Sequence, residues 1–516
     1  MNKFLSLLLL LGFSISNIVA QKIYKVSATD TSAAFSSIEE LNSSMNIFKP
    51  GDKILFRRGE IFRGGIMVKA HGTANNYITF GAYRRGKLPV ISGAIVPENW
   101  KQLNKHSKIW KHKIPQADPE GVSVFIRKAD KLSWGHWRPS IKYLTEPNDF
   151  YWDKNSLTLY VYSKSNPNTE CEIRVGINWY CLWGAYDGER DSAECSYIKI
   201  KNLEFRHAFE GGVRGQTHHW IIQNIKSHHN GLREWPRKIP IDSLTPSLGE
   251  GIEFDGSDGL IMHNEIYENG IHGIHVHANG YFIVQRDTIQ FNKVYNSYHT
   301  NIDIKNDFQP DNYIRDIVIK NNTVFDNHDY ECNGIQVTAE REDEEIKSDV
   351  RNVEICNNTI IHPRGVAIAV YNWSKTVKIY GNIIYNPLHD AIQITAASNI
   401  PSKLYFENIE LYNNIAVRSD SEYDVFVVDD KNHQVKAGYN VWFNKSGGNI
   451  VRWNNREFKN VEVYQSITGQ GKNSVFEDPL FLDPDNNNFT FADDSPVRFL
   501  HAEFWKTISR LLLNIF

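Results

Sequence analysis

Six segments in the centre of the chain share one pattern of apolar and polar positions. The second residue of each segment is Ile, and the fourth is Phe, Val or Ile. The segments are Gly251–Asp255, Gly273–His277, Asn301–Lys305, Gly334–Thr338, Ala367–Tyr371 and Ala391–Thr395. Because successive side chains of a β-strand point to opposite faces, this alternation predicts six half-buried strands. Their second residues are expected to form one inward column: Ile252, Ile274, Ile302, Ile335, Ile368 and Ile392.

A second type of segment alternates with the first and is an apolar strand that ends in Asn. Its copies are Ile198–Asn202, Trp220–Asn224, Leu260–Asn264, Ile317–Asn322, Val353–Asn358, Val377–Asn382 and Ile409–Asn414. Most neighbouring Asn residues are 22 to 40 positions apart, which suits one coil of a parallel β-helix with loops of variable length. Asn at a turn tolerates left-handed backbone and can hydrogen-bond to its stacked neighbours. A leucine-rich repeat or a propeller would need other repeat patterns, which we do not find.

The strand and turn signals predict an all-β fold, a parallel β-helix with an inserted β-rich module. The insertion is rich in Trp and Tyr and includes a hairpin around Asp153–Ser156. The basic start, the apolar stretch Leu5–Ile15 and the small-residue site before Gln21 predict a signal peptide. The ranges are 1–20 signal peptide, 21–96 first part of the β-helix, 97–196 insertion, 197–450 main β-helix, 451–497 closing coils and 498–516 helical cap or tail.

The charge balance limits the classes of partner. The chain has 57 basic and 60 acidic residues, which argues against a nucleic-acid binder. After the signal peptide no apolar run is long enough to span a membrane, so we expect a secreted or periplasmic monomer. The spacing of the five Cys residues matches no metal-binding framework, and we expect them to be small buried residues.

The chain resembles the right-handed parallel β-helix family of the pectate-lyase-like superfamily. The resemblance is carried by the coils from 198 to 444, by Lys49–Gly59 with its Pro-Gly-Asp, and by Asp478–Asp483 and Asp494–Pro496 near the end. It covers about three quarters of the mature chain, and the last 19 residues depart from it. The resemblance implies a right-handed solenoid. It does not imply one activity, because the superfamily includes polysaccharide lyases, glycoside hydrolases, uronate epimerases and non-enzymatic adhesins.

Polar residues at the third and fifth positions of the first three segments form the candidate site. They are Glu253, Asp255, His275, His277, Asp303 and Lys305. Stacked strands lie about 4.8 Å apart, so the Cα atoms of Glu253 and Asp303 should lie about 9.6 Å apart. We expect these six groups to gather in one exposed groove walled by the loop 231–250.

Such a cluster supports three kinds of chemistry. In the first, Glu253, Asp255 and Asp303 bind Ca²⁺, which neutralises a substrate uronate and acidifies its C5 proton. Lys305 or a neutral histidine, His275 or His277, then removes that proton, as in a polysaccharide lyase.

The second chemistry is hydrolysis, with Glu253 and Asp303 as acid and base at the separation of an inverting enzyme. The third is a transition-metal site made by His275 and His277 with Asp255 or Asp303.

Four further residues are candidates for substrate binding: Arg214, Arg233, Trp235 and His272. Arg214 shares a column with Glu253 and can either clamp a substrate carboxylate or form an ion pair with Glu253. We therefore expect a lyase acting on an acidic polysaccharide. The alternatives are a glycoside hydrolase at the same groove and a non-catalytic glycan-binding or adhesive solenoid.

Overall fold

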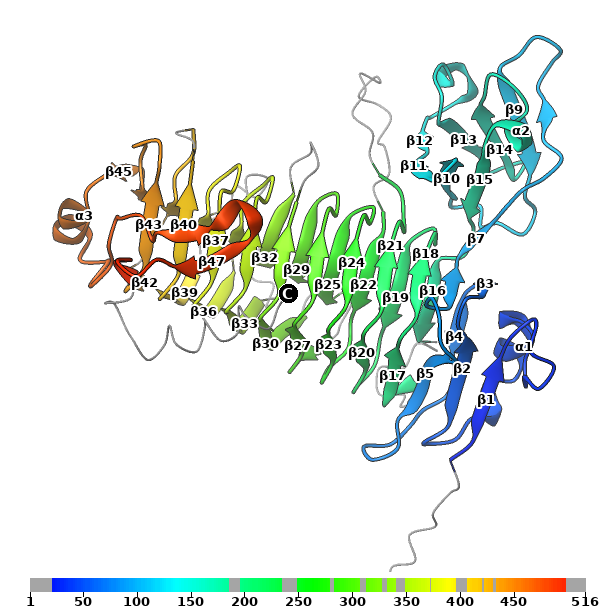
Figure 1. Ribbon diagram of the computed structural model, residues 1–516, viewed down its shortest axis with the longest axis horizontal. Helices are drawn as coiled ribbons and strands as arrows, with labels where there is room; N and C mark the ends of the chain where they lie inside the picture. Colours follow the sequence, from blue (N-terminus) through cyan, green and yellow to red (C-terminus); the bar gives the residue numbers. More distant parts are fainter. Residues whose placement is uncertain are drawn as a thin grey trace, which may run out of the picture.

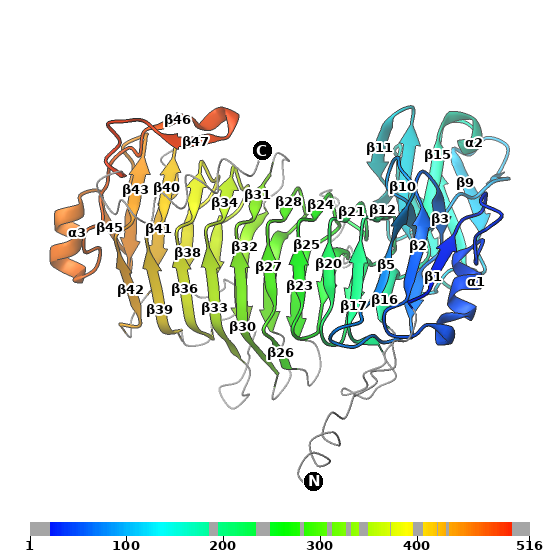
Figure 2. The ribbon, with the colours of Figure 1, turned by 60° about the horizontal axis from the view of Figure 1, so that its bottom comes forward.

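The fold is a long solenoid of three parallel β-sheets that run side by side along the molecule (Figures 1 and 2). The structure is a computed structural model. It describes residues 21–184, 195–233, 248–278, 283–306, 312–326, 332–339, 349–371, 373–395, 406–419, 422–429 and 433–497. The predicted signal peptide, 1–20, and the predicted helical cap, 498–516, lie outside the described residues.

Each coil contributes one strand to each sheet. Sheet A contains β1 (Ile23–Val26), β2 (Lys53–Arg57), β5 (Ile78–Tyr83), β17 (Ile198–Lys201), β20 (Ile221–Gln223), β23 (Leu260–Met262), β27 (Thr288–Gln290), β30 (Tyr313–Lys320), β33 (Asp349–Cys356), β36 (Ser374–Tyr380), β39 (Phe406–Tyr412), β42 (Val435–Gly438) and, beside β30, β26 (Ile283–Gln285). Sheet B contains β3 (Ile61–Arg63), β6 (Val90–Ser92), β18 (Glu204–Arg206), β21 (Lys226–His228), β24 (Glu265–Tyr267), β28 (Lys293–Tyr295), β31 (Thr323–Phe325), β34 (Thr359–Ile361), β37 (Ile383–Tyr385), β40 (Ile415–Arg418) and β43 (Val441–Asn444). Sheet C contains β4 (Ile66–Val68), β16 (Tyr180–Gly184), β19 (Gly211–Gly215), β22 (Glu250–Phe254), β25 (His272–Ala278), β29 (Thr300–Asn306), β32 (Asn333–Ala339), β35 (Ile368–Val370), β38 (Ile392–Ile394), β41 (Phe426–Val428), β44 (Val451–Trp453) and the antiparallel β45 (Arg456–Phe458).

The predicted isoleucine column is confirmed and lies along the inner side of sheet C. Ile252 pairs with Ile274, and the register continues through all six predicted positions to Ile392. Every member is fully buried. Full burial of one such side chain stabilises a fold by about 1.5–3 kcal/mol, so the column fixes the register of this sheet.

A ladder of asparagines stacks along the turn between sheets A and B. Its members are Asn264, Asn292, Asn322, Asn358, Asn382, Asn414 and Asn440. Each side-chain amide of the first six donates to the side-chain oxygen of the next member at 2.9–3.1 Å. The predicted stacking is confirmed, but the left-handed residue is the one before each ladder member, such as Asn321 before Asn322.

The inserted module has two small sheets that project from the N-terminal end of the β-helix (Figure 1). One sheet contains β11 (Lys131–Trp134), β10 (Ser123–Lys128), β15 (Glu172–Gly176) and β7 (Ala94–Ile95). The other contains β12 (His136–Trp137), β13 (Asp149–Asp153), β14 (Thr158–Tyr162), β9 (Ile109–Lys113) and β8 (Lys101–Gln102), and the short helices are η2 (Ile141–Tyr143) and α2 (Pro167–Glu170). The module shares an apolar core with Phe209 and Leu232 of the coils.

Sheet C resumes at β16, earlier than the expected boundary at 196. This strand pairs in parallel with β4 on one side and β19 on the other. The sequence pattern missed it because β16 carries no turn Asn, so the first recognisable repeat was the one at 198.

Helices cover both ends of the solenoid (Figure 2). At the N-terminal end, α1 (Ile38–Ser43) buries Ile38 and Leu41 and is followed by η1 (Met45–Ile47). At the other end, α3 (Val461–Thr468) buries Tyr464 against Trp453 and Phe458. The remaining elements are β46 (Phe481–Asp483), η4 (Pro484–Asn486) and β47 (Asn488–Phe491).

The range 451–497, expected to hold closing coils, therefore holds mostly a helix and an antiparallel hairpin. Single parallel bridges at Lys472 and Val475 continue the coil pattern only briefly. All five cysteines are free, and four of them are buried as expected. None of the helices in the described ranges has the length and apolar character needed to cross a membrane.

Candidate functional site

Sheet C places the predicted polar residues on three adjacent strands. Glu253 of β22 pairs with His275 of β25, which pairs with Asp303 of β29. In the next column His277 pairs with Lys305. The predicted register of these residues is confirmed, and their roles remain predictions. We use the name sheet C cluster for these residues together with the side chains around them: Tyr180, Glu210, Arg214, Glu250, Glu253, Asp255, His272, His275, His277, Asp303 and Lys305.

The cluster is more buried than the exposed groove that we expected. Five of the six predicted residues are at most 8% exposed, and only Lys305 is half-buried. The reason is that long side chains of the same rung and of nearby rungs cover one another. The rings of His275 and His277 stack at 4.5 Å between centroids, and Tyr180 lies against Glu253.

Arg214 and Tyr180 hold the two carboxylates of β22. Arg214 forms an ion pair of 2.8 Å with Asp255 and one of 3.5 Å with Glu253. The Tyr180 hydroxyl donates to Glu253 at 2.6 Å and accepts from Arg214 at 3.1 Å. The ion-pair alternative for Arg214 is thus observed, with Asp255 as its nearer partner.

Glu250 also belongs to the cluster, although the alternating pattern did not predict it. Glu250 and Glu253 are three positions apart. With strict alternation their side chains would point to opposite faces of the strand. The alternation breaks at Gly251, where a Cβ would collide with the interior side chain of Ile266. Position 251 and the buried Ile252 therefore both face the interior, and Glu250 faces outward like Glu253.

One feature of the sequence could have identified Glu250 as a member of the cluster: its alignment with His272 on the next strand. Glu250 pairs with His272 as Glu253 pairs with His275. Glu210, just before β19, was also missed, although its carboxylate lies with those of Glu250 and Glu253 in one group. In this group one carboxylate oxygen of each residue lies within 4.8 Å of the other two.

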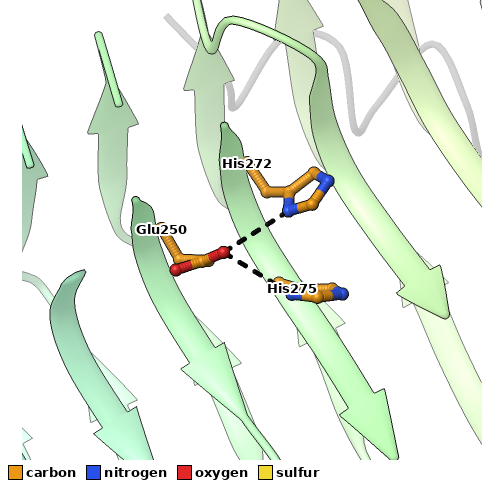
Figure 3. A group of neighbouring side chains, drawn as sticks. All are labelled: Glu250, His272 and His275. Atoms are coloured by element: carbon orange, nitrogen blue, oxygen red, sulfur yellow. Dashed lines mark ion pairs between the residues drawn. The ribbon is translucent and has the colours of Figure 1, made fainter. Parts of the chain in front are cut away.

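Figure 3 shows Glu250 facing two imidazoles of the next rung, those of His272 and His275. Glu250 Oε1 lies 3.7 Å from His272 Nδ1 and 3.9 Å from His275 Nδ1. The other ring nitrogens face Asp303, whose Oδ2 lies 3.3 Å from His272 Nε2 and 3.8 Å from His275 Nε2. Both histidines are thus enclosed between a carboxylate on the previous rung and one on the next.

The surroundings of the carboxylates shift their pKa values in opposite directions. Burial raises the pKa of Glu253, but hydrogen bonds from His277 and Tyr180 and the charge of Arg214 outweigh it, and the net pKa is lowered. Burial and the neighbouring Glu253 raise the pKa of Glu210 to about 7 and that of Glu250 well above its ordinary value. These shifts favour the ionised form of Glu253, while Glu210 and Glu250 hold their protons more tightly than an ordinary carboxyl group does.

The same burial keeps the histidines neutral. Burial lowers the pKa of His272 to about 3, against the attraction of Asp303. Burial, together with the positive charges that His272 and His277 would carry, lowers the pKa of His275 well below its ordinary value. Both imidazoles therefore have a lone pair available at neutral pH.

Three groups of side chains in the described part of the chain can hold a metal ion. They are Glu250 with His272 and His275, Glu253 with Asp255 and His277, and Glu210 with Glu250 and Glu253. The predicted calcium set of Glu253, Asp255 and Asp303 is not among them. Calcium prefers six to eight oxygen ligands, and groups that include imidazole nitrogen suit a transition metal better.

The remaining predicted residues have different positions. His272 lies in the cluster, as expected. Arg233 is only 5% exposed, pairs with Glu268 at 3.0 Å and lies over the Trp134 ring of the insertion. These contacts give Arg233 a structural role, and its role in substrate binding stays a prediction. Trp235 and most of the loop 231–250 lie outside the described residues.

Comparisons with known proteins support the fold. Residues 148–455 match the family model described as "Right handed beta helix region". The uncharacterized protein YwoF of Bacillus subtilis (strain 168) is 24% identical over 192 residues, which cover 36% of this chain and 38% of that protein. The match thus spans less than half of that relative.

Two solved structures are similar in fold. The complex of XylC with xylose has a TM-score of 0.51 at 14% identity, covering 84% of this chain and 86% of that one. The GH136 lacto-N-biosidase from Eubacterium ramulus has a TM-score of 0.48 at 13% identity, covering 89% of this chain and 67% of that one. At these identities the likeness concerns the fold alone.

Proposed function

Because the chain belongs to the right-handed β-helix family, we propose that it is a polysaccharide-degrading enzyme whose active site is the sheet C cluster. The observation that carries this proposal is the carboxyl pair Glu210 and Glu253. Their oxygens lie within 4.8 Å, and their surroundings push the two pKa values in opposite directions. A protonated acid beside an ionised carboxylate is the arrangement that cleavage of a glycosidic bond requires.

The reaction that this pair favours is hydrolysis with retention. Retaining enzymes hold two carboxyl groups about 5–5.5 Å apart, whereas inverting enzymes hold them about 6.5–9.5 Å apart. One oxygen of Glu210 lies within 4.8 Å of one oxygen of Glu253, so the pair favours the shorter separation. Glu253 and Asp303, the pair expected from the sequence, are two rungs apart with His275 between them.

Each residue of the pair then has one role. Glu253 attacks the anomeric carbon and forms a covalent glycosyl-enzyme, while Glu210 donates its proton to the leaving oxygen. Water then enters, Glu210 removes its proton, and the bond to Glu253 breaks. Tyr180 and Arg214 keep Glu253 ionised before the attack and orient its carboxylate. The similar XylC structure, which contains xylose, supports a sugar as the ligand of this fold.

The second candidate is the lyase expected from the sequence, with an acidic polysaccharide as substrate. The observation that favours it is the pair of neutral imidazoles, His272 and His275, on the strand next to Lys305. A neutral imidazole can remove the C5 proton of a uronate. The carboxylates of the cluster would repel that uronate, so a bound Ca²⁺ would supply the neutralising charge. The hydrolase needs no such cation, and for this reason we rank it first.

One experiment tests the proposal and separates the two reactions. The purified protein is incubated with a panel of neutral and uronate-containing polysaccharides. Reducing ends are measured together with the ultraviolet absorbance of the unsaturated product that elimination makes. Hydrolysis yields reducing ends without absorbance, whereas elimination yields both.

Three variants assign the reaction to residues. We expect Glu253→Gln to abolish hydrolysis and Lys305→Ala to leave most of it. The matched control is Glu354→Gln on sheet A, because Glu354 also accepts a hydrogen bond from a tyrosine, Tyr380, at 2.9 Å. Elimination that is lost in Lys305→Ala and in chelator would establish the lyase instead. Glycan binding without any cleavage would leave the non-catalytic alternative.

A further inference from the structure

The geometry points to a divalent transition-metal site formed by Glu250, His272 and His275, with Zn²⁺ as the ion that suits it best. One oxygen and two nitrogens converge there, each within 4.8 Å of the others. Glu250 Oε1 lies 3.7 and 3.9 Å from the two Nδ1 atoms. Two ligands on a tetrahedral zinc with bonds of about 2.1 Å lie about 3.4 Å apart, so small side-chain movements close the site around an ion.

Unsatisfied nitrogens are the second observation. Among the described residues, His272 Nδ1 and both ring nitrogens of His275 have no hydrogen-bond partner. The two residues are 8% and 6% exposed. A buried polar atom without a partner destabilises the folded state, and such atoms are rare in folded proteins. A cation in front of the two Nδ1 atoms would satisfy them.

On the side of the two rings away from Glu250, a carboxylate faces the ring nitrogens that would not bind the metal. Metal-binding histidines usually have such a partner. Asp303 Oδ2 faces both Nε2 atoms, at 3.3 and 3.8 Å. The other oxygen of Asp303 accepts from Gln336 at 3.1 Å. A carboxylate in this place favours the tautomer with hydrogen on Nε2, which leaves the Nδ1 lone pair for the metal.

The group of Glu253, Asp255 and His277, which also combines carboxylates with an imidazole, is a weaker candidate for a metal site. Its carboxylate Asp255 already receives two hydrogen bonds from Arg214, at 2.8 and 3.2 Å. The guanidinium therefore occupies the place of a cation there. The nitrogen ligands of the Glu250 group also disfavour calcium, which takes oxygen ligands. Three protein ligands would leave the fourth position of the ion open to water or substrate.

The proposal is independent of the proposed function and is tested by metal binding alone. Tag-free, full-length protein is stripped with chelator, and Zn²⁺ or Ca²⁺ is titrated calorimetrically. We expect one Zn²⁺ per chain and much weaker Ca²⁺ binding. Co²⁺ in the same site should show the stronger visible absorption of a four-coordinate ion.

Matched variants locate the ion. His275→Asn and Glu250→Gln should weaken Zn²⁺ binding by more than the roughly 10- to 100-fold loss typical of an outer-layer partner. Asp303→Asn should show that smaller loss. The control His263→Asn removes an exposed histidine with left-handed backbone, which Asn also adopts. It should bind Zn²⁺ like the unaltered chain.

Three outcomes would overturn the proposal. They are no stoichiometric Zn²⁺ binding, equal loss in His263→Asn and His275→Asn, and loss in His277→Asn with His275→Asn unaffected. Circular dichroism and the thermal midpoint establish that each variant is folded. If His275→Asn does not fold, the isosteric Glu250→Gln decides the question.

Discussion

The Tyr180 hydroxyl reaches Glu253 from two rungs away and donates a hydrogen bond of 2.6 Å. Gly211, on the rung between them, makes this possible. A Cβ at Gly211 would lie 2.6 Å from the Tyr180 ring, so only glycine leaves room for the ring to pass over the strand. The strand β16, with which sheet C resumes after the insertion, thus contributes a residue directly to the carboxylate of β22.

The first prediction concerns this hydrogen bond. Tyr180→Phe removes a donor that stabilises ionised Glu253, and a hydrogen bond to a charged group contributes about 1.5–3 kcal/mol. We expect kcat/KM to fall about 10- to 100-fold. Because the donor lowers the pKa of Glu253, its loss should raise that pKa and move the acidic limb of the pH profile to higher pH.

The matched control for this variant is Tyr380→Phe. Tyr380 donates to Glu354 on sheet A at 2.9 Å, so the same hydroxyl is removed away from the site. The control should keep both the rate and the pH profile. An unchanged acidic limb in Tyr180→Phe would show that Glu253 is not the ionised catalytic carboxylate.

The second prediction concerns Glu210 and the basic limb. Burial raises the pKa of Glu210 to about 7, so its acid form is lost as the pH rises through 7. Hydrolysis should fall above this pH, and Glu210→Gln should remove the limb. General acids contribute about 100- to 10,000-fold, so the variant should lose that much on a polysaccharide. On an aryl glycoside, whose leaving group needs no proton, it should lose much less. An equal loss on both substrates would contradict the role of general acid.

The register of the solenoid could be predicted from the sequence because it depends on local alternation. Each Ile of the sheet C column repeats in the same five-residue context, and the column fixes which polar residues stack. The stacking of Glu253, His275 and Asp303 followed directly from it.

What could not be predicted depends on departures from alternation and on distant residues. Glu250 faces outward because the backbone at Gly251 breaks the period of two. Tyr180 lies 73 positions from Glu253, in a strand without the repeat signature. The burial of the cluster was missed for the same reason, since it arises from side chains on neighbouring rungs.

The third prediction concerns the asparagine ladder. Asn322 accepts from the backbone amide of Asn292 at 2.9 Å and donates to the carbonyl of Ile289 at 3.0 Å. Asn322→Ala leaves these buried groups without a partner, at about 1–3 kcal/mol each. We expect the thermal midpoint to fall by several degrees. Asn75→Ala, in an exposed turn, is the control and should not change it. Equal midpoints for the two variants would mean that the ladder adds no stability.

The last prediction is a pH-dependent gain in stability from Asp390→Asn. Burial, with repulsion from Asp424, raises the pKa of Asp390 from 3.8 to about 6. The folded chain therefore binds this proton more tightly than the unfolded chain. Stability is lost as the pH rises from about 4 to 6, and the loss is complete above 6.

A shift of this size corresponds to at most about 3 kcal/mol. The carboxamide of the Asp390→Asn variant would keep the oxygen that accepts from the Asp424 backbone amide at 2.9 Å, so the substitution removes only the charge. We expect the variant to have a higher thermal midpoint than the unaltered chain at pH 7–8 and the same midpoint near pH 4. Measuring both proteins in the same buffers cancels the titration of every other group. A difference that does not change between pH 4 and pH 8 would show that the buried charge of Asp390 is not its cause.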